Sequence, residues 1–109
     1  MNIALVGGIA RCERDLDFLA REAGHHLEFH RGHVGGRGAD GLKAMIERAN
    51  VVIIVTQINS HGSMYLAKKV ARQLGRDALV LRKCGPVTFQ ALLEQLAETG
   101  RLSDFRRCA

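Results

Sequence analysis

The sequence predicts a small α/β domain: a doubly wound, Rossmann-like parallel sheet of four strands in the order 2-1-3-4, with helices on both faces. Two observations lead to this prediction. Short apolar runs alternate with segments of helical period, which is the pattern of repeated βα units. The run at residues 51–55 is β-branched throughout, as in a central strand covered on both faces. Because crossovers between parallel neighbours are right-handed, the simplest arrangement is the doubly wound one.

The predicted elements alternate regularly along the chain. We expect strands at residues 3–6, 27–29, 51–55 and 78–81. Apolar residues spaced by three and four predict a helix after each strand, with one stripe facing the sheet. The stripes are Leu16, Leu19 and Ala23; Leu42, Met45, Ile46 and Ala49; Met64, Ala67, Ala71 and Leu74; and Phe89, Leu92, Leu93 and Leu96. Gly24, Gly75 and Gly100 follow three of these stripes, where left-handed residues end helices.

Length and composition indicate one domain. The chain has 109 residues, of which 47% are hydrophobic and 25% charged, so it can bury one core and has no room for a second. We assign residues 1–100 to a single α/β domain and residues 101–109 to a short basic C-terminal tail. The cysteines are widely spaced, and the chain has no apolar run of about 18 residues and no signal-peptide pattern. These features predict a cytoplasmic protein that does not contact membranes.

The charge and the small sheet suggest partners. A net charge of +5 attracts polyanions, but the basic residues are dispersed and few aromatic residues are available to stack on bases. Nucleic acid is therefore possible and not favoured, and the basic tail leaves open an interaction module for nucleic acid or protein. We expect a homodimer, because the edge strands of so small a sheet are usually covered or paired.

Ligands of open parallel sheets bind beyond the carboxyl ends of the strands, where the strand order reverses. In the predicted order this point lies between the first and third strands, and four loops meet there. The loops carry Gly7, Gly8 and Arg11; His30, Gly32 and Arg37; Asn59, Ser60 and His61; and Lys83 and Cys84. The sequence therefore places its polar and thiol candidates on one rim of the sheet.

Three of these residues are candidate metal ligands: His30, His61 and Cys84. Neutral imidazole and thiolate suit zinc, iron and haem iron. The chain has no local His-Glu-x-x-His or Cys-x-x-Cys motif, so their convergence rests on the fold, and Cys12 is expected to pack in the first helix. The leading hypothesis is a cofactor-binding or sensory module that holds a transition metal or haem iron at the rim.

The runner-up hypothesis is a protein or enzyme that binds a nucleotide or another phosphorylated ligand. Glycines let the backbone approach a phosphate at the start of a helix, although the full Gly-x-Gly-x-x-Gly and Walker motifs are absent. The candidate binding residues are Gly7, Gly8, Arg11, Gly32, Arg37, Asn59 and Ser60, with His61 as acid or base. The sequence leaves open whether any reaction is catalysed.

An ordered set of short motifs resembles a known family. Val6-Gly7-Gly8, His30-Arg31-Gly32 and Asn59-Ser60-His61 occur in turn, followed by Lys68 or Lys69. This set resembles the bacterial domain-of-unknown-function family 2325 (DUF2325) over nearly the whole chain. The resemblance implies a small α/β fold and the importance of Gly7, Gly8, His30, Ser60 and His61, and it implies no reaction.

The chain departs from the family pattern at two positions. It has Asn50 where members usually carry an acid, and Ala71 where a cysteine often occurs. The first difference weakens the case for a catalytic carboxylate. The second weakens the case for a metal site built from several cysteines.

Overall fold

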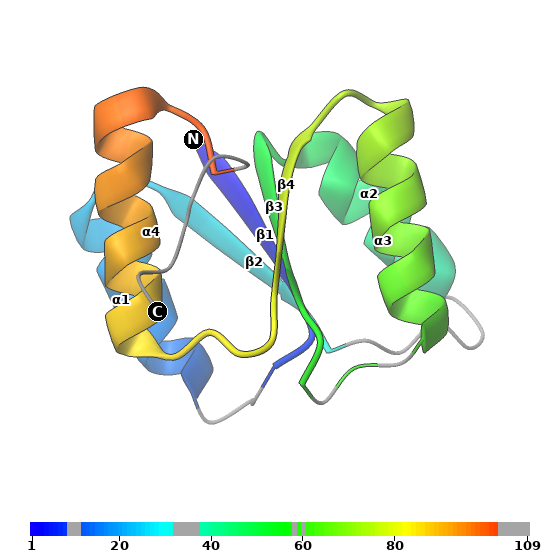
Figure 1. Ribbon diagram of the computed structural model, residues 1–109, viewed down its shortest axis with the longest axis horizontal. Coiled ribbons are helices and arrows are strands. Elements are labelled where there is room, and N and C mark those ends of the chain that lie inside the picture. Colours follow the sequence, from blue (N-terminus) through cyan, green and yellow to red (C-terminus); the bar gives the residue numbers. More distant parts are fainter. Residues whose placement is uncertain (9–11, 32–37, 58, 60, 103–109) are drawn as a thin grey trace.

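A computed structural model describes residues 1–8, 12–31, 38–57, 59 and 61–102 (Figure 1). Within these residues the chain alternates strands and helices, as the sequence predicts. The elements are β1 (Asn2–Val6), α1 (Glu13–Glu22), β2 (His26–His30), α2 (Gly38–Arg48), β3 (Val51–Val55), α3 (His61–Gln73), β4 (Asp77–Leu81) and α4 (Pro86–Thr99). The four strands form one parallel sheet in the order β2-β1-β3-β4, which confirms the predicted fold.

The sheet is built outward from two buried strands. Every residue of β3 is buried, and so are the last four residues of β1. This matches their aliphatic sequences, because a strand covered on both faces excludes water from every side chain. β2 is longer than predicted by one residue at each end, since Asn2 is paired with His26 and Val6 with His30. Pairing with β1 therefore extends β2 to His26 and His30, two polar residues that the apolar run at residues 27–29 did not include.

Helices cover both faces of the sheet, as predicted. α1 and α4 lie together on one face, and α2 and α3 lie on the other (Figure 1). Leu16 and Phe89 are fully buried on the first face, and Leu42 and Ile46 are fully buried on the second. The molecule therefore has two hydrophobic layers that share the sheet between them.

The chain beyond α4 returns to the sheet. Gly100 ends α4 in the left-handed conformation, with φ of 74°, and Leu102 is fully buried in the layer of α1 and α4. The backbone N–H of Leu102 donates a hydrogen bond to the Asp77 carboxylate at the start of β4. The core therefore includes Leu102, two residues beyond the domain boundary drawn from the sequence.

Helix length and hydropathy also bear on membrane insertion. Among the described residues, no helix is both long enough and apolar enough to cross a bilayer.

Candidate functional site

The carboxyl ends of the strands meet at one rim, where the loops after β1 and β3 turn to opposite faces. The loop after β1 leads to α1 and the loop after β3 leads to α3, and these helices lie on different sides of the sheet (Figure 1). This divergence is the point at which the strand order reverses, and it is the usual ligand position in such sheets.

Gly7 and Gly8 use their backbone amides to hold this rim together. The Gly7 N–H donates to the carbonyl oxygen of His30 at 2.7 Å, and the Gly8 N–H donates to that of Gln57 at 3.1 Å. In this conformation the two amides join the end of β2 and the loop after β3 to the end of β1. They are therefore already engaged within the protein and do not form an open cradle for a phosphate.

Asn59 occupies the space that a side chain at residue 7 would need. Its Nδ2 donates to the carbonyl oxygen of Val55 at 2.8 Å and lies 3.5 Å from that of Val6. Gly7 has a φ of +87°, and a Cβ on it would lie 2.6 Å from Asn59 Nδ2 and 2.6 Å from the Val55 oxygen. Asn59, predicted as a cofactor-binding residue, thus makes contacts that join the ends of β1 and β3.

The structure does not bring the predicted metal ligands together. His30 is partly buried, and its Nε2 lies 3.1 Å from the Gly38 carbonyl oxygen at the start of α2, to which an Nε2–H donates. His61 is exposed at the first position of α3, and Cys84 lies in the loop after β4. In the described part of the chain, no three histidine, cysteine or acidic residues are grouped so that they could hold a metal ion.

Cys84 instead shares a small cavity with Cys12. The cavity has a volume of about 90 Å³ and is lined by Gly8, Cys12, Gln57, Lys83, Cys84 and Gly85. It lies beyond the ends of β1, β3 and β4 and beside the first residues of α1 and α4. Cys12 is the N-cap of α1 and packs against the hydrophobic layer of α1 and α4, and it also lines this cavity at the rim.

The two helices that begin at this cavity differ in their electrostatics. The first turn of α1 contains Glu13 and Asp15, which complement the positive end of the helix. The first turn of α4 contains no acidic residue, and its N-cap, Gly85, has no side chain to accept from the first amides. Together with the ammonium group of Lys83, the start of α4 makes this part of the cavity favourable for an anion.

Comparison with known proteins gives the family. The family described as "Uncharacterized protein conserved in bacteria (DUF2325)" matches residues 2–96. The chain belongs to this family. The matched span runs from β1 into α4, so the resemblance carried by the three rim motifs is confirmed.

This DUF2325 protein is also similar to a curated bacterial protein, "UPF0751 protein DSY3086" of Desulfitobacterium hafniense (strain Y51). The two are 28% identical over 95 residues, which cover 87% of this chain and 93% of the relative. No solved structure matches the chain.

Four of the predicted binding residues lie outside the described residues of this DUF2325 protein: Arg11, Gly32, Arg37 and Ser60. Of the others, Gly8 lines the cavity, and Gly7 and Asn59 join the ends of the strands. Among the candidate side chains described at the rim, His61 lies on the side of α3, Lys83 and the thiols of Cys12 and Cys84 lie at the cavity on the other side, and His30 lies at the end of β2.

Proposed function

We propose that this DUF2325 protein is a cofactor-binding or sensory module that holds haem iron through the imidazole of His61. The observation that carries the proposal is the position of this side chain. His61 is exposed at the start of α3, next to the point where the strand order reverses, and no described residue forms a hydrogen bond or ion pair with it. An imidazole so placed is accessible and could serve as a ligand to iron.

The number of protein ligands favours haem iron over zinc. Structural zinc sites use four protein ligands and catalytic ones three, and the described residues supply no group of three. In haem the porphyrin supplies four nitrogen ligands, so one histidine is enough. The Nε2 of His30 is already directed to the Gly38 carbonyl, so His30 is not needed as a ligand in this proposal.

The face of α3 beyond His61 suits a flat, partly apolar and partly anionic molecule. Tyr65 follows four residues later, on the same side of the helix, and is 69% exposed. Aromatic side chains pack well against planar ring systems. Lys69, also exposed on α3, supplies a cation for a haem carboxylate.

The test is a haemin titration followed by absorption spectroscopy. We expect a shifted Soret band at one haem per chain, and loss of this band in His61→Ala. His26→Ala is the matched control, because His26 is exposed at the opposite, amino end of β2. An unchanged spectrum in His61→Ala would rule out the proposed ligand, and the absence of a Soret shift in the wild type would rule out haem.

A second function is favoured by the cavity on the other side of the rim: binding of a phosphorylated ligand such as a nucleotide. Lys83 and the uncapped start of α4 supply positive charge there. The volume of about 90 Å³ is well below the roughly 300–1,000 Å³ of complete ligand pockets. We therefore propose that this cavity takes a single phosphate group and that the rest of the ligand lies on the rim.

Thermal unfolding in the presence of phosphate, pyrophosphate and ATP tests the second function. A ligand that binds the native state raises the Tm, and we expect Lys83→Ala to abolish this rise. Arg82→Ala is the control, because Arg82 is the exposed neighbour of Lys83 and does not line the cavity. The second function is excluded if none of the three anions raises the Tm, or if both variants respond like the wild type.

Homodimer formation, nucleic-acid binding by the basic tail and a cytoplasmic location remain predictions. The part of the tail from residue 103 onward lies outside the described residues.

A further inference from the structure

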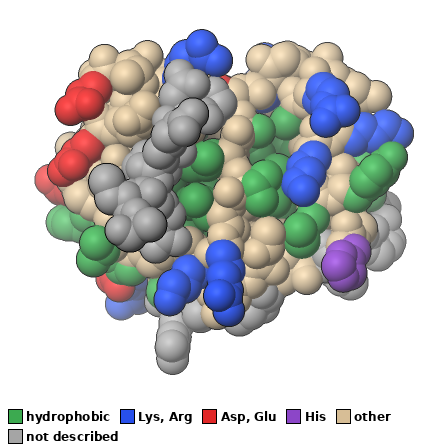
Figure 2. All heavy atoms as spheres, in the orientation of Figure 1, with side chains coloured by type: hydrophobic (Ala, Val, Ile, Leu, Met, Phe, Trp, Pro, Cys, Tyr) green, Lys and Arg blue, Asp and Glu red, His purple; other side chains and the backbone are tan. Residues whose placement is uncertain are grey.

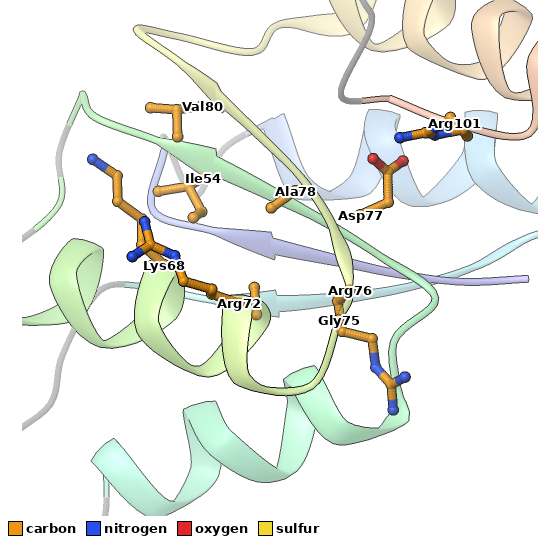
Figure 3. A pocket seen from close by; sticks show the side chains of 10 residues that line it. Ile54, Lys68, Arg72, Gly75, Arg76, Asp77, Ala78, Val80 and Arg101 are labelled. Atoms are coloured by element: carbon orange, nitrogen blue, oxygen red, sulfur yellow. The ribbon is translucent and has the colours of Figure 1, made fainter.

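A large basic groove runs beside β4, away from the rim. It has a volume of about 690 Å³, and Ala78 and Val80 of β4 are among the residues that line it. Lys68 and Arg72 of α3 flank the groove, and Arg76 lies at one end of it (Figure 3). The groove therefore combines the edge of the sheet with a row of cations.

Within the part of the chain that the structure describes, one edge of β4 has no neighbouring strand. Among the described strands, β4 pairs with β3 alone. The Thr56 N–H donates to the Leu81 carbonyl at 2.8 Å, so the backbone groups of Leu81 face β3. Because these groups alternate along a parallel strand, those of Ala78 and Val80 point away from β3, and the Val80 side chain is 44% exposed. Such an edge is a template for strand addition.

The Asp77 carboxylate also lines the groove and accepts a hydrogen bond from the Leu102 N–H, but it forms no ion pair with the basic side chains of α3 beside this edge. α3 has 13 residues, none of them acidic, and no described carboxylate forms an ion pair with Lys68 or Arg72. The Arg76 guanidinium donates to the carbonyls of Ile46 and Glu47, so it too keeps its charge. Figure 2 shows Lys and Arg side chains beside hydrophobic ones on the face that carries β4.

We propose that an extended peptide segment with acidic side chains binds in this groove and adds a strand to the open edge of β4. Strand addition gives main-chain hydrogen bonds, and alternate side chains give specificity. Since side chains on one face of a strand recur at every second residue, acidic residues with this spacing face Lys68 and Arg72. The partner is therefore defined by two independent features, the backbone edge and the charge.

The charge pattern disfavours two other occupants. A second copy paired through β4 about a two-fold axis would bring its own Lys68 and Arg72 to the same interface, where like charges repel. Single-stranded nucleic acid binds through aromatic platforms as well as cations, and none of the described residues that line this groove is aromatic. Both occupants are outcomes that the experiment distinguishes.

The test uses defined probes and fluorescence anisotropy with the full chain. The first probe is a labelled decapeptide that alternates glutamate and threonine. In the second probe proline replaces each threonine, which keeps the charge and removes half of the backbone donors. A labelled decauridylate is the third. We expect the first peptide to bind at least about tenfold more tightly than the other two, a difference of about 1.4 kcal/mol.

Two variants locate the binding. Lys68→Glu combined with Arg72→Glu is expected to weaken binding of the first peptide at least about tenfold. Arg14→Glu combined with Lys43→Glu, on α1 and α2, changes the net charge equally and should bind like the wild type. Val80→Pro removes the outward N–H of β4 and should weaken binding, whereas Val80→Ala should not. If Val80→Pro does not fold, as judged by circular dichroism, the proline peptide tests the same hydrogen bonds.

Several results would overturn the proposal. Equal affinity for the two peptides would show that the groove attracts their charge but does not add them as a strand. Tighter binding of the decauridylate would identify a nucleic-acid surface. Sedimentation of the wild type as a dimer that Val80→Pro dissociates would identify a second copy as the occupant.

Discussion

At the residue scale, Gly7 has less room for a side chain than Gly24. Its φ of +87° is costly for other residues, and the atoms beside it leave no room for a Cβ. Gly24 has a similar φ of +81°, but no atom lies within 4 Å of the place that a Cβ would occupy. A side chain at Gly24 would meet backbone strain alone, whereas one at Gly7 would meet both backbone strain and steric overlap.

We predict that Gly7→Ala destabilises the protein by about 3 kcal/mol or more, because left-handed strain of about 1–3 kcal/mol adds to the displacement of Asn59. Gly24→Ala carries the strain alone and should cost about 1–2 kcal/mol. Urea unfolding of both variants measures the difference. Equal losses of stability would show that the loop after β3 moves aside without cost.

A second residue-scale prediction concerns Glu28. Hydrogen bonds from Arg48 lower the pKa of the Glu28 carboxyl below its ordinary value of 4.5. The unfolded chain then takes up this proton at a higher pH than the native protein, so the stabilisation is complete above about pH 4.5 and is lost as the pH falls through the native pKa. We expect Glu28→Gln to lower the Tm at pH 6 and to have a smaller effect at pH 3.

Thermal unfolding of the wild type and Glu28→Gln at both pH values checks this prediction. Because the pair is on the surface, the effect should be small and should diminish in high salt. A Tm difference that does not change with pH would mean that the pair makes no ionic contribution.

The positions of several candidate residues at the rim could be predicted from the sequence, but their contacts could not. The sequence marked His30, Asn59 and Cys84 because they follow strands. It did not indicate that the His30 ring contacts Gly38 or that Asn59 binds the carbonyl of Val55, because such contacts depend on how each loop folds back. Cys12 and Cys84 line one cavity, and they are too far apart in the sequence for any spacing rule to relate them.

At the scale of elements, Arg76 links α2 to the strand that follows α3. Its Nη2 donates to the Glu47 carbonyl at 2.9 Å, and its Nε lies 3.4 Å from the Ile46 oxygen. Both carbonyls belong to the last turn of α2, whose end carries partial negative charge. The guanidinium therefore supplies a donor to the Glu47 carbonyl and lies beside the Ile46 carbonyl, which also accepts from the Ala49 N–H.

We predict that Arg76→Ala destabilises the protein by about 1–2 kcal/mol, near the lower end of the range for hydrogen bonds to charged groups, because Arg76 is partly exposed. Arg72→Ala removes the same side chain from an exposed position on α3 and should cost less than about 0.5 kcal/mol. Denaturant unfolding compares the two. If Arg72→Ala lost as much stability as Arg76→Ala, the cause would be the loss of a positive charge in general and not the loss of the contact with α2.

Element boundaries were predicted best where hydrophobicity coincides with burial. The run at residues 51–55 agrees with β3, because all of its side chains are buried. β4 begins at Asp77, one residue before the predicted apolar run. The extra residue is held by pairing with Val51, an interaction between strands that local composition does not reveal.

For the molecule as a whole, the segment after α4 closes one hydrophobic layer. Leu102 is fully buried, since it is packed with the residues of α1 and α4. We predict that Leu102→Ala destabilises the protein by about 2–4 kcal/mol, the range for a buried leucine. Val87→Ala, at a side chain that is 86% exposed, should cost less than about 0.5 kcal/mol.

Thermal and denaturant unfolding of the two variants provide the measurement. Equal stability of Leu102→Ala and Val87→Ala would show that the chain after Gly100 does not belong to the cooperative core.

The whole fold followed from the sequence because its alternating pattern allows few topologies once crossovers are right-handed. The binding partners could not be predicted from the sequence, because they depend on surfaces assembled from distant segments of the chain. The groove beside β4 joins Lys68 and Arg72 of one helix to Val80 of an edge strand, and only the order of the strands brings these residues together.

The strand order also determines the order in which strands can pair and hydrophobic layers can close while the chain is synthesised. β2 and β3 each pair with β1, and β4 pairs with β3, so every strand meets a neighbour that the ribosome has already made. The layer of α2 and α3 lacks only Ala78 of β4 among its described residues when α3 emerges, whereas α1 must wait for α4 and Leu102. A nascent or stalled chain therefore leaves the apolar side of α1 and the sheet exposed, and this is the surface on which chaperones would act and misassembly would begin.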